Sequence, residues 1–254
     1  MWLVREPPRR VAPEDVNRSA SFSETMRFLS AHRASLGALF AGLSLLGVVS
    51  YATMTWYPTL FVRNFSEPVQ RVGLTFGPIY VIASVTGNLV GAWCAVKLAD
   101  RGYRDPCVLW AVITTVAVTL GGALVPLVPQ LHVSYAATAV MLLFQNAWMG
   151  SAVAAVHLAV PNRMRAQLTA ILLFGTNIVG LVLGPSTVAS ITQYVFKDPL
   201  ALRYSLMTVS AVAGTSAVLT LWYSWRRFSE LGRATQSAPG LAQPEIAYEE
   251  ADSG

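Results

Sequence analysis

A few polar and aromatic side chains interrupt the long apolar stretches of this sequence, and they are the groups that could bind a solute. They are Asn88, Gln145, Asn146, Asn177, Tyr51 and Trp56. An unpaired polar group inside a membrane is costly, so such residues mark either a ligand pathway or a hydrogen bond between helices. Both interpretations stay open for each amide. Trp56 has a third, as an aromatic anchor at the membrane surface.

The sequence contains few residues that could carry out acid–base or other catalytic chemistry. The apolar stretches hold no Asp, Glu, Lys or Arg, and His157 near the end of one stretch could relay a proton or simply be a hydrogen-bonded histidine at a helix end. Cys94 and Cys107 have no metal or redox spacing. The three histidines, two cysteines and absent buried carboxylates form no triad or metal cluster. We therefore expect no enzyme, no cofactor and no metal.

Long stretches without Asp, Glu, Lys or Arg, here called charge-free runs, are expected to form the six helices that hold these polar groups in place. The chain is 54% hydrophobic and 12% charged, against about a quarter charged residues in soluble domains. A membrane-spanning helix needs about 20 apolar residues, and the longest run is divided by Pro126 and Pro129. The runs predict an all-α membrane protein rather than a soluble helical core. The expected spans are about 34–57, 72–97, 107–128, 133–158, 167–193 and 204–225.

The basic residues predict the orientation of the spans. Of the 18 Lys and Arg residues, all but Arg63, Arg71, Lys197 and Arg203 fall at the termini or in the turns after the second and fourth spans. The positive-inside rule then places both termini in the cytoplasm. The net charge of +5 thus reflects orientation in a plasma membrane, and no basic folded domain for nucleic acid is present.

The two ends of the chain are predicted to lie outside the bilayer. Residues 1–33 read as a cytoplasmic linker, irregular at first and then a short amphipathic helix in "SFSETMRFLS". Ser21 or Ser23 could cap that helix, and Phe22, Met26 and Leu29 share one face. The helix either lies on the membrane surface or is a frayed lead-in to the first span. Residues 227–254 are predicted to be a disordered cytoplasmic tail.

Two motifs carry a resemblance to a known family. In "KLADRGYRDP", residues 97–106, Leu98, Ala99, Asp100 and Arg101 match a cytoplasmic loop signature of the major facilitator superfamily. "VPNRMRAQLTAILLFGTNIVGLVLGP", residues 160–185, is similar to a segment of its Spinster-like members, in which an Asn occupies the position of Asn177. "REPPRR" and "DPLALRYSL" are similar to further parts of the same proteins.

The resemblance covers most of the chain but only the second half of a twelve-span transporter. It implies half of a major facilitator fold, built from two inverted three-helix repeats, with a substrate held between two halves near the membrane midplane. It also implies transport of small organic or amphipathic solutes by alternating access. Because the charge-free runs hold no Asp, Glu, Lys or Arg, only His157 and the tyrosines could titrate within the spans. Any coupling site is therefore expected in the other half, or the protein is a uniporter.

The charged turn suggests a conformational latch. Asp100 ends the second span, and the fifth span begins beside Arg163 and Arg165 with free backbone N–H groups. We hypothesise that Asp100 docks there in one conformation and is released in the other, together with Arg101 and Arg104. The alternative is that these charges only fix topology in a solvated loop.

Two further expectations concern movement and assembly. Gly184 and Pro185 predict a bend in the fifth span, since proline removes a backbone hydrogen bond. One half cannot enclose a central cavity, so the chain is a fragment, which we favour, or pairs with a separate N-terminal half, or forms a homodimer. A rival interpretation from another class is a membrane scaffold that transports nothing.

Overall fold

The computed structural model describes residues 20–236, and the predictions for residues 1–19 and 237–254 lie outside the described residues. Six helical stretches, some of them made of two adjoining elements, are long and apolar enough to cross a membrane, so the predicted all-α, six-span class is confirmed. The helices are α1 (Phe22–Ala31), the π-helix η1 (Arg33–Gly37), α2 (Ala38–Phe65), α3 (Val69–Asp100), α4 (Pro106–Leu124), the 3-10 helix η2 (Val125–Leu127), α5 (Leu131–Asn146), α6 (Met149–Ala159), α7 (Asn162–Ser190), the π-helix η3 (Ile191–Phe196), the 3-10 helix η4 (Pro199–Ala201) and α8 (Leu202–Gln236).

Most helices are longer than the charge-free runs that predicted them. A charge-free run measures the part of a helix that can lie in hydrocarbon, whereas the helix itself continues into the polar interface. The largest difference is at α8, which continues to Gln236. Residues 227–236, predicted as part of a disordered tail, are therefore helical.

The fourth span, predicted at about 133–158, covers Leu131–Ala159 and is interrupted once. It consists of α5 and α6, separated by a turn at Ala147 and Trp148. The indole Nε1–H of Trp110 on α4 donates a 3.0 Å hydrogen bond to the carbonyl of Ala147. Because this partner replaces a bond lost from the helix, the break depends on a tertiary contact and not on a local sequence signal.

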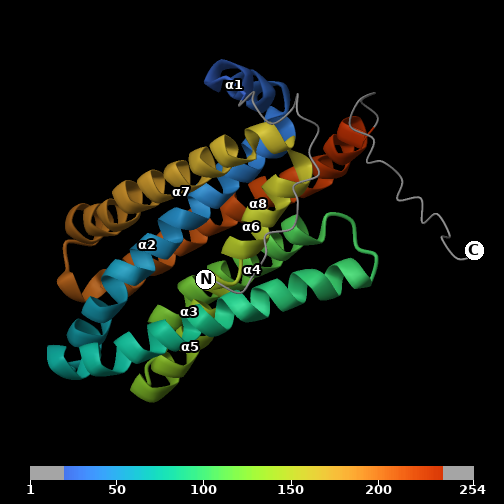
Figure 1. Ribbon diagram of the computed structural model, residues 1–254. Coiled ribbons are helices and arrows are strands. Elements are labelled where there is room, and N and C mark those ends of the chain that lie inside the picture. The colour runs from blue at the N-terminus through green and yellow to red at the C-terminus, as the bar shows by residue number, and fades with distance from the viewer. Residues whose placement is uncertain (1–19, 237–254) are drawn as a thin grey trace, which may run out of the picture.

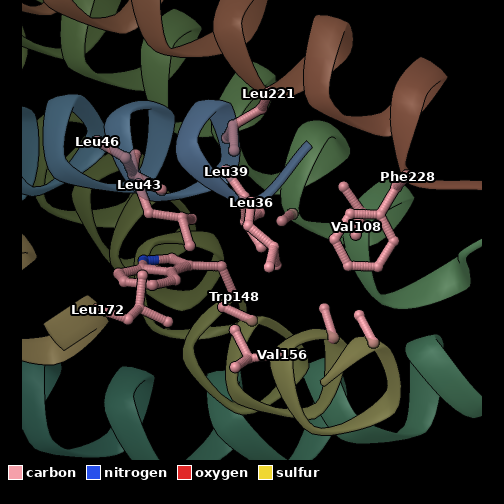
Figure 2. Close-up of a cluster of buried hydrophobic side chains, with 14 of the residues drawn as sticks. Leu36, Leu39, Leu43, Leu46, Val108, Trp148, Val156, Leu172, Leu221 and Phe228 are labelled. Carbon is pink, nitrogen blue, oxygen red and sulfur yellow. The ribbon is translucent and has the colours of Figure 1, made fainter. Parts of the chain in front are cut away.

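The core is arranged around α2. Its 18-residue apolar window is 61% buried, compared with 22% for the windows of α3 and α7. Leu36, Leu39 and Leu43 are fully buried and face Trp148 from the fourth span (Figure 2). A second cluster around Tyr57 and further aromatic residues fills the other end of the bundle. The poorly buried α3 and α7 therefore present most of their surface outwards.

Elements that the sequence predicts to be cytoplasmic lie together at one end of the bundle, here called the basic end. This end carries α1, the turn between α3 and α4, and the last turns of α8 (Figure 1). The indole Nε1–H of Trp225 on α8 donates a 3.1 Å hydrogen bond to the carbonyl of Arg104 in that turn. At the opposite end, the amide of Asn64 bonds to the carbonyl of Leu200 at 3.1 Å.

Helix α1 packs on the bundle at the basic end. Ser21 is its N-cap residue, and the carboxylate of Glu24 accepts a hydrogen bond from the N–H of Ser21 at 3.1 Å. The fully buried Thr25 donates to the side-chain oxygen of Gln167 on α7 at 2.5 Å. The side-chain nitrogen of Gln167 in turn donates to the carbonyl of Ala20 at 2.7 Å. These bonds fix α1 beside the start of α7.

Candidate functional site

A pocket of about 400 Å³ opens on the face of the bundle formed by α2, α3, the α5–α6 turn and α7. We call it the wall pocket. Its lining residues are Gly47, Ser50, Tyr51, Met54, Tyr80, Asn88, Gln145, Asn146, Trp148, Met149, Thr176 and Asn177. They come from four separate spans, so the folded bundle brings together residues that lie far apart in the sequence.

The wall pocket gathers five of the six residues singled out from the sequence, namely Tyr51, Asn88, Gln145, Asn146 and Asn177. The hydroxyl of Tyr51 on α2 donates to the side-chain oxygen of Asn177 on α7 at 2.5 Å. The side-chain nitrogen of Asn177 donates to the carbonyl of Leu173, one turn earlier, at 2.6 Å. Tyr51 and Asn177 thus form one polar unit across two helices.

The other three amides are held in two different ways. Asn88 and Asn146 each donate to a carbonyl of their own helix, at 2.9 and 2.8 Å. Gln145 is buried, and its side-chain oxygen accepts a 3.0 Å hydrogen bond from Thr53 on α2. Among the described residues, no partner is recorded for Asn88 Oδ1, Asn146 Oδ1 or Gln145 Nε2. These three atoms give the pocket acceptors and a donor for a bound solute.

Sequence reasoning missed part of the lining. The hydroxyls of Ser50 and Thr176 are buried at the pocket and have no hydrogen-bond partner. Serine and threonine are easily accommodated in apolar helices because they can bond to their own backbone, so no signal marked them. Met54, Tyr80 and Met149 resemble ordinary packing residues in the sequence, yet they give the pocket polarisable and aromatic surface.

The lining of the wall pocket is polar but uncharged. It contains four amide side chains, two tyrosines and a tryptophan, and it contains no Asp, Glu, Lys, Arg or His. A charged solute would lack a compensating charge on this wall, and burying an unpaired charge is expensive. The lining therefore suits an uncharged solute that has hydrogen-bonding groups and apolar surface.

Trp56 does not line the wall pocket. It lines a second pocket of about 330 Å³ at the end of the bundle opposite the basic end, which we call the end pocket. The indole Nε1–H of Trp56 donates to the carbonyl of Pro185 on α7 at 3.1 Å. Trp56 is therefore held against α7, away from Tyr51.

Gly184 and Pro185 lie where α7 crosses α2. A Cβ on Gly184 would lie 2.6 Å from the carbonyl oxygen of Val48 and 2.9 Å from the nitrogen of Ala52. Helix α7 continues through both residues to Ser190 before the π-helix η3 begins. Close approach accounts for the glycine, and the predicted bend stays a prediction.

The residues of the predicted latch lie near the basic end. Asp100, Arg101, Arg104 and Arg163 are exposed. The side chain of Arg165 bonds through Nε to the carbonyl of Val160 at 3.0 Å. Over residues 20–236 no ion pair is recorded between Asp100 and either arginine of α7. The structure thus has the latch residues apart, and the latch stays a prediction.

Two titratable groups near the same end have defined surroundings. Burial raises the pKa of the Asp105 carboxyl, an effect that the neighbouring Arg104 partly offsets. Its Oδ2 atom is buried without a hydrogen-bond partner. His157 Nε2 lies 3.2 Å from the hydroxyl oxygen of Thr169, so it links α6 to α7. A proton-relay role for His157 stays a prediction.

The geometry agrees with comparisons to known proteins. The family model described as Major Facilitator Superfamily matches residues 1–185, which is well over half of the chain. The chain belongs to this superfamily of membrane transporters. It is therefore an integral, multi-pass membrane protein.

Individual relatives extend this finding. The chain is 24% identical over 198 residues to an MFS-type efflux pump of Mycolicibacterium smegmatis, a match covering 74% of this chain and 44% of the pump. The fold is similar to that of a bacterial homolog of the human lysosomal transporter Spinster, solved in an inward-facing, unoccupied conformation. That match has a TM-score of 0.54 and 17% identity, and it covers 91% of this chain and 54% of the other.

A second structure of the bacterial homolog, inward-facing and occupied, gives a TM-score of 0.55 at 17% identity and covers 91% of this chain and 53% of the other. These findings confirm the resemblance to Spinster-like transporters, at the level of superfamily and fold. The chain spans about half the length of the proteins it matches.

Proposed function

We propose that the chain forms one wall of a secondary transporter that moves small, uncharged organic or amphipathic solutes by alternating access. The wall pocket supports this proposal most strongly, because it collects amide and aromatic side chains from four spans on one open face. A scaffold protein would leave such residues dispersed among contacts between helices. The uncharged lining favours solutes without a formal charge.

We further propose that a second six-span unit closes this wall. The helices that flank the pocket, α3 and α7, have apolar windows only 22% buried. Leu89 on α3 and Leu181 on α7 are 68% and 59% exposed. The second unit is an N-terminal half encoded with this chain or separately, or else a second copy of this chain.

Transport by the wall pocket is tested with a neutral amphipathic dye, Nile red, in cells that express the chain alone or with a six-span N-terminal half. We expect energy-dependent efflux in the second case, slowed at least tenfold by Asn177→Ala or Gln145→Ala, on the order of one lost hydrogen bond to a bound solute. Val182→Ala, at a residue of α7 that is 56% exposed and outside the wall pocket, is the matched control. Equal efflux in the control and pocket variants, at equal expression, would overturn the assignment of the site.

The latch belongs to this proposal as its conformational element. When the basic end closes, Asp100 would meet the first turn of α7, where free N–H groups and two arginines favour a carboxylate. Asp100→Asn should shift the balance towards the conformation open at the basic end. Cysteine accessibility measured from the two sides of the membrane reports this balance. An unchanged balance together with an unchanged efflux rate would eliminate the latch.

The proposed orientation places the basic end in the cytoplasm of a plasma membrane. It rests on the excess of basic residues in the termini and in the two turns at that end. A single cysteine at exposed Arg104, in a background lacking Cys94 and Cys107, should react with a membrane-impermeant maleimide only after the cells are opened. Labelling of intact cells would reverse the orientation.

A further inference from the structure

The end pocket lies apart from the wall pocket and shares none of its lining residues. It is formed where α2 ends, beside the π-helix η3 and the turn that follows it. Its lining residues are Trp56, Arg63, Thr192, Gln193, Lys197 and Asp198, together with small or apolar neighbours. At this end the helices leave the apolar stretch, so the pocket lies at the depth of lipid head groups.

The end pocket concentrates positive charge on a side of the protein where such charge is scarce. Only four of the 18 Lys and Arg residues fall on this side by sequence, and Arg63 and Lys197 both line the pocket. The remaining two are engaged elsewhere, because Arg71 pairs with Glu67 at 3.6 Å and the guanidinium of Arg203 lies 5.7 Å from the ring centre of Tyr204.

The cations of the end pocket have no fixed ionic partner. Within the described part of the chain no ion pair is recorded for Arg63 or Lys197. Asp198 also lines the pocket, but its Oδ1 already accepts a 2.9 Å hydrogen bond from the N–H of Leu200. Two cations and one carboxylate leave a net charge of +1, which favours an anionic ligand.

The backbone at Lys197 is unusual for its residue type. Lys197 ends η3 in the left-handed region, with φ 55° and ψ 22°. This conformation favours glycine or asparagine, and a residue with a Cβ adopts it at an energetic cost. At this position asparagine would keep the backbone conformation while removing the charge of the lysine.

Trp56 and Ala189 precede Arg63 and Lys197 by about two helical turns, so they form the part of the end pocket nearer the bilayer centre, here called its floor, and the two cations form its rim. Trp56 is fixed by its hydrogen bond to Pro185, and Ala189 of α7 lies in the same lining. A ligand that filled the pocket would therefore meet an apolar floor below a cationic rim. Free phosphate could contact only the rim, whereas a lipid could contact both.

We propose that the end pocket binds an anionic phospholipid, with its phosphate between Arg63 and Lys197 and its glycerol backbone and first methylenes against Trp56. Arginine and lysine are the usual protein partners of phosphate, and tryptophan is favoured at the depth of the glycerol region. This inference does not depend on the proposed transport function, because the site is defined by residues outside the wall pocket.

The proposal is tested by native mass spectrometry of the full chain in detergent. The probes are dioleoyl phosphatidylglycerol, dioleoyl phosphatidylcholine and inorganic phosphate, each titrated separately. The variants are Arg63→Gln and Lys197→Asn, singly and combined, since asparagine keeps the left-handed backbone without the charge. Arg71→Gln is the control, because it removes the same charge on the same side from a residue outside the pocket.

We expect phosphatidylglycerol to bind more tightly than phosphatidylcholine, and each pocket variant to weaken its binding about fivefold. Arg71→Gln should leave the binding unchanged. An equal loss in Arg71→Gln, or equal binding of the two lipids, would overturn the site. If inorganic phosphate bound as tightly as phosphatidylglycerol, the rim alone would be the site and the lipid assignment would be wrong.

Discussion

Helices α2 and α7 meet in two neighbouring regions that are built by opposite means. In the first, which we call the seam, Gly47 and Gly180 let the two backbones approach closely, and the side chains of Thr176 and Tyr51 pack against these glycines. One turn away, in the wall pocket, Tyr51 and Asn177 face each other through a hydrogen bond. The seam joins the helices by shape alone, whereas the wall joins them through polar groups that a solute can also use.

This difference separates stability from binding in neighbouring turns of the same helices. The seam tolerates no added atom, so changes there should act on folding. In the wall, the amide nitrogen of Asn177 keeps its bond to its own helix when Tyr51 changes, and its side-chain oxygen faces the open pocket. Changes in the wall should therefore act on solute binding with little effect on folding.

Breaking the seam should give the largest effect on stability. In Gly180→Ala the new Cβ would lie 2.6 Å from Tyr51 Cδ2 and 2.8 Å from the carbonyl of Gly47, so the backbones must separate. We expect a loss of about 2 kcal/mol, measured by thermal unfolding in detergent. Gly175→Ala on the same helix is the control, because its Cβ would meet only Ser44 Oγ, at 3.9 Å. Equal melting temperatures for the two variants would contradict the account of the seam.

A change at Trp110 tests whether the turn between α5 and α6, which lines the wall pocket, depends on a buried hydrogen bond from α4. Trp110→Phe removes the donor to the carbonyl of Ala147 and should cost about 1–2 kcal/mol, because a buried acceptor loses its partner. The same thermal measurement applies. Trp93→Phe is the matched control, since Trp93 is 61% exposed. A loss in Trp93→Phe as large as that in Trp110→Phe would show that the hydrogen bond is not the cause.

A change in the wall pocket should affect efflux more than it affects stability. Tyr51→Phe removes the hydrogen bond to Asn177, and its effect on the free energy of unfolding should stay at or below about 0.5 kcal/mol. Nile red efflux by the assembled transporter should nevertheless change several-fold, because the carboxamide oxygen of Asn177 is freed. Tyr194→Phe, at a residue 70% exposed outside the pocket, is the control. A large drop in melting temperature without any change in efflux would assign Tyr51 to the seam.

The smallest effect on the melting temperature is expected for a change of Asp105, which lies outside the seam and the wall pocket. Burial raises the pKa of this carboxyl in the folded protein, so its contribution to stability is fully present below the unfolded pKa of about 4 and is lost as the pH rises through the folded value. Asp105→Asn should therefore flatten the fall in melting temperature that begins as the pH rises above about 4. Asparagine also suits the positive φ of 47° at this position.

If Asp105→Asn left the fall in melting temperature as steep as it is in the parent chain, burial of the Asp105 carboxyl would not be its cause.

The sequence predicted the spans well because charge exclusion from lipid is a strong and local rule. Each predicted span became a helical stretch long enough to cross a membrane, with an interruption at Ala147 and Trp148 in the fourth. The break at Ala147 escaped prediction because its stabilising donor, Trp110, comes from another helix. Helix ends extended beyond the prediction for a related reason, since charged residues end the contact with lipid without ending the helix.

The candidate site could be predicted only in part. Amides in apolar helices are rare enough to be noticed, and Asn177 and Gln145 indeed line the wall pocket. Ser50 and Thr176 could not be distinguished from other small polar residues, because their place at the pocket depends on how α2 and α7 pack. Trp56 lies close to Tyr51 in sequence, but α7 holds its indole at Pro185. The sequence does not show which side of its helix faces the pocket, because the packing of the helices decides this.

The two hydrogen bonds of Gln167 have a mechanical consequence. They tie Ala20 and Thr25 to α7, although the chain continues from α1 into α2. A displacement of the chain at residue 20 would thus be transmitted to α7, the fifth span, through Gln167 as well as to α2 along the chain. A fluorescent label at residue 20 should accordingly follow any displacement of α7, and Gln167→Leu should uncouple the two.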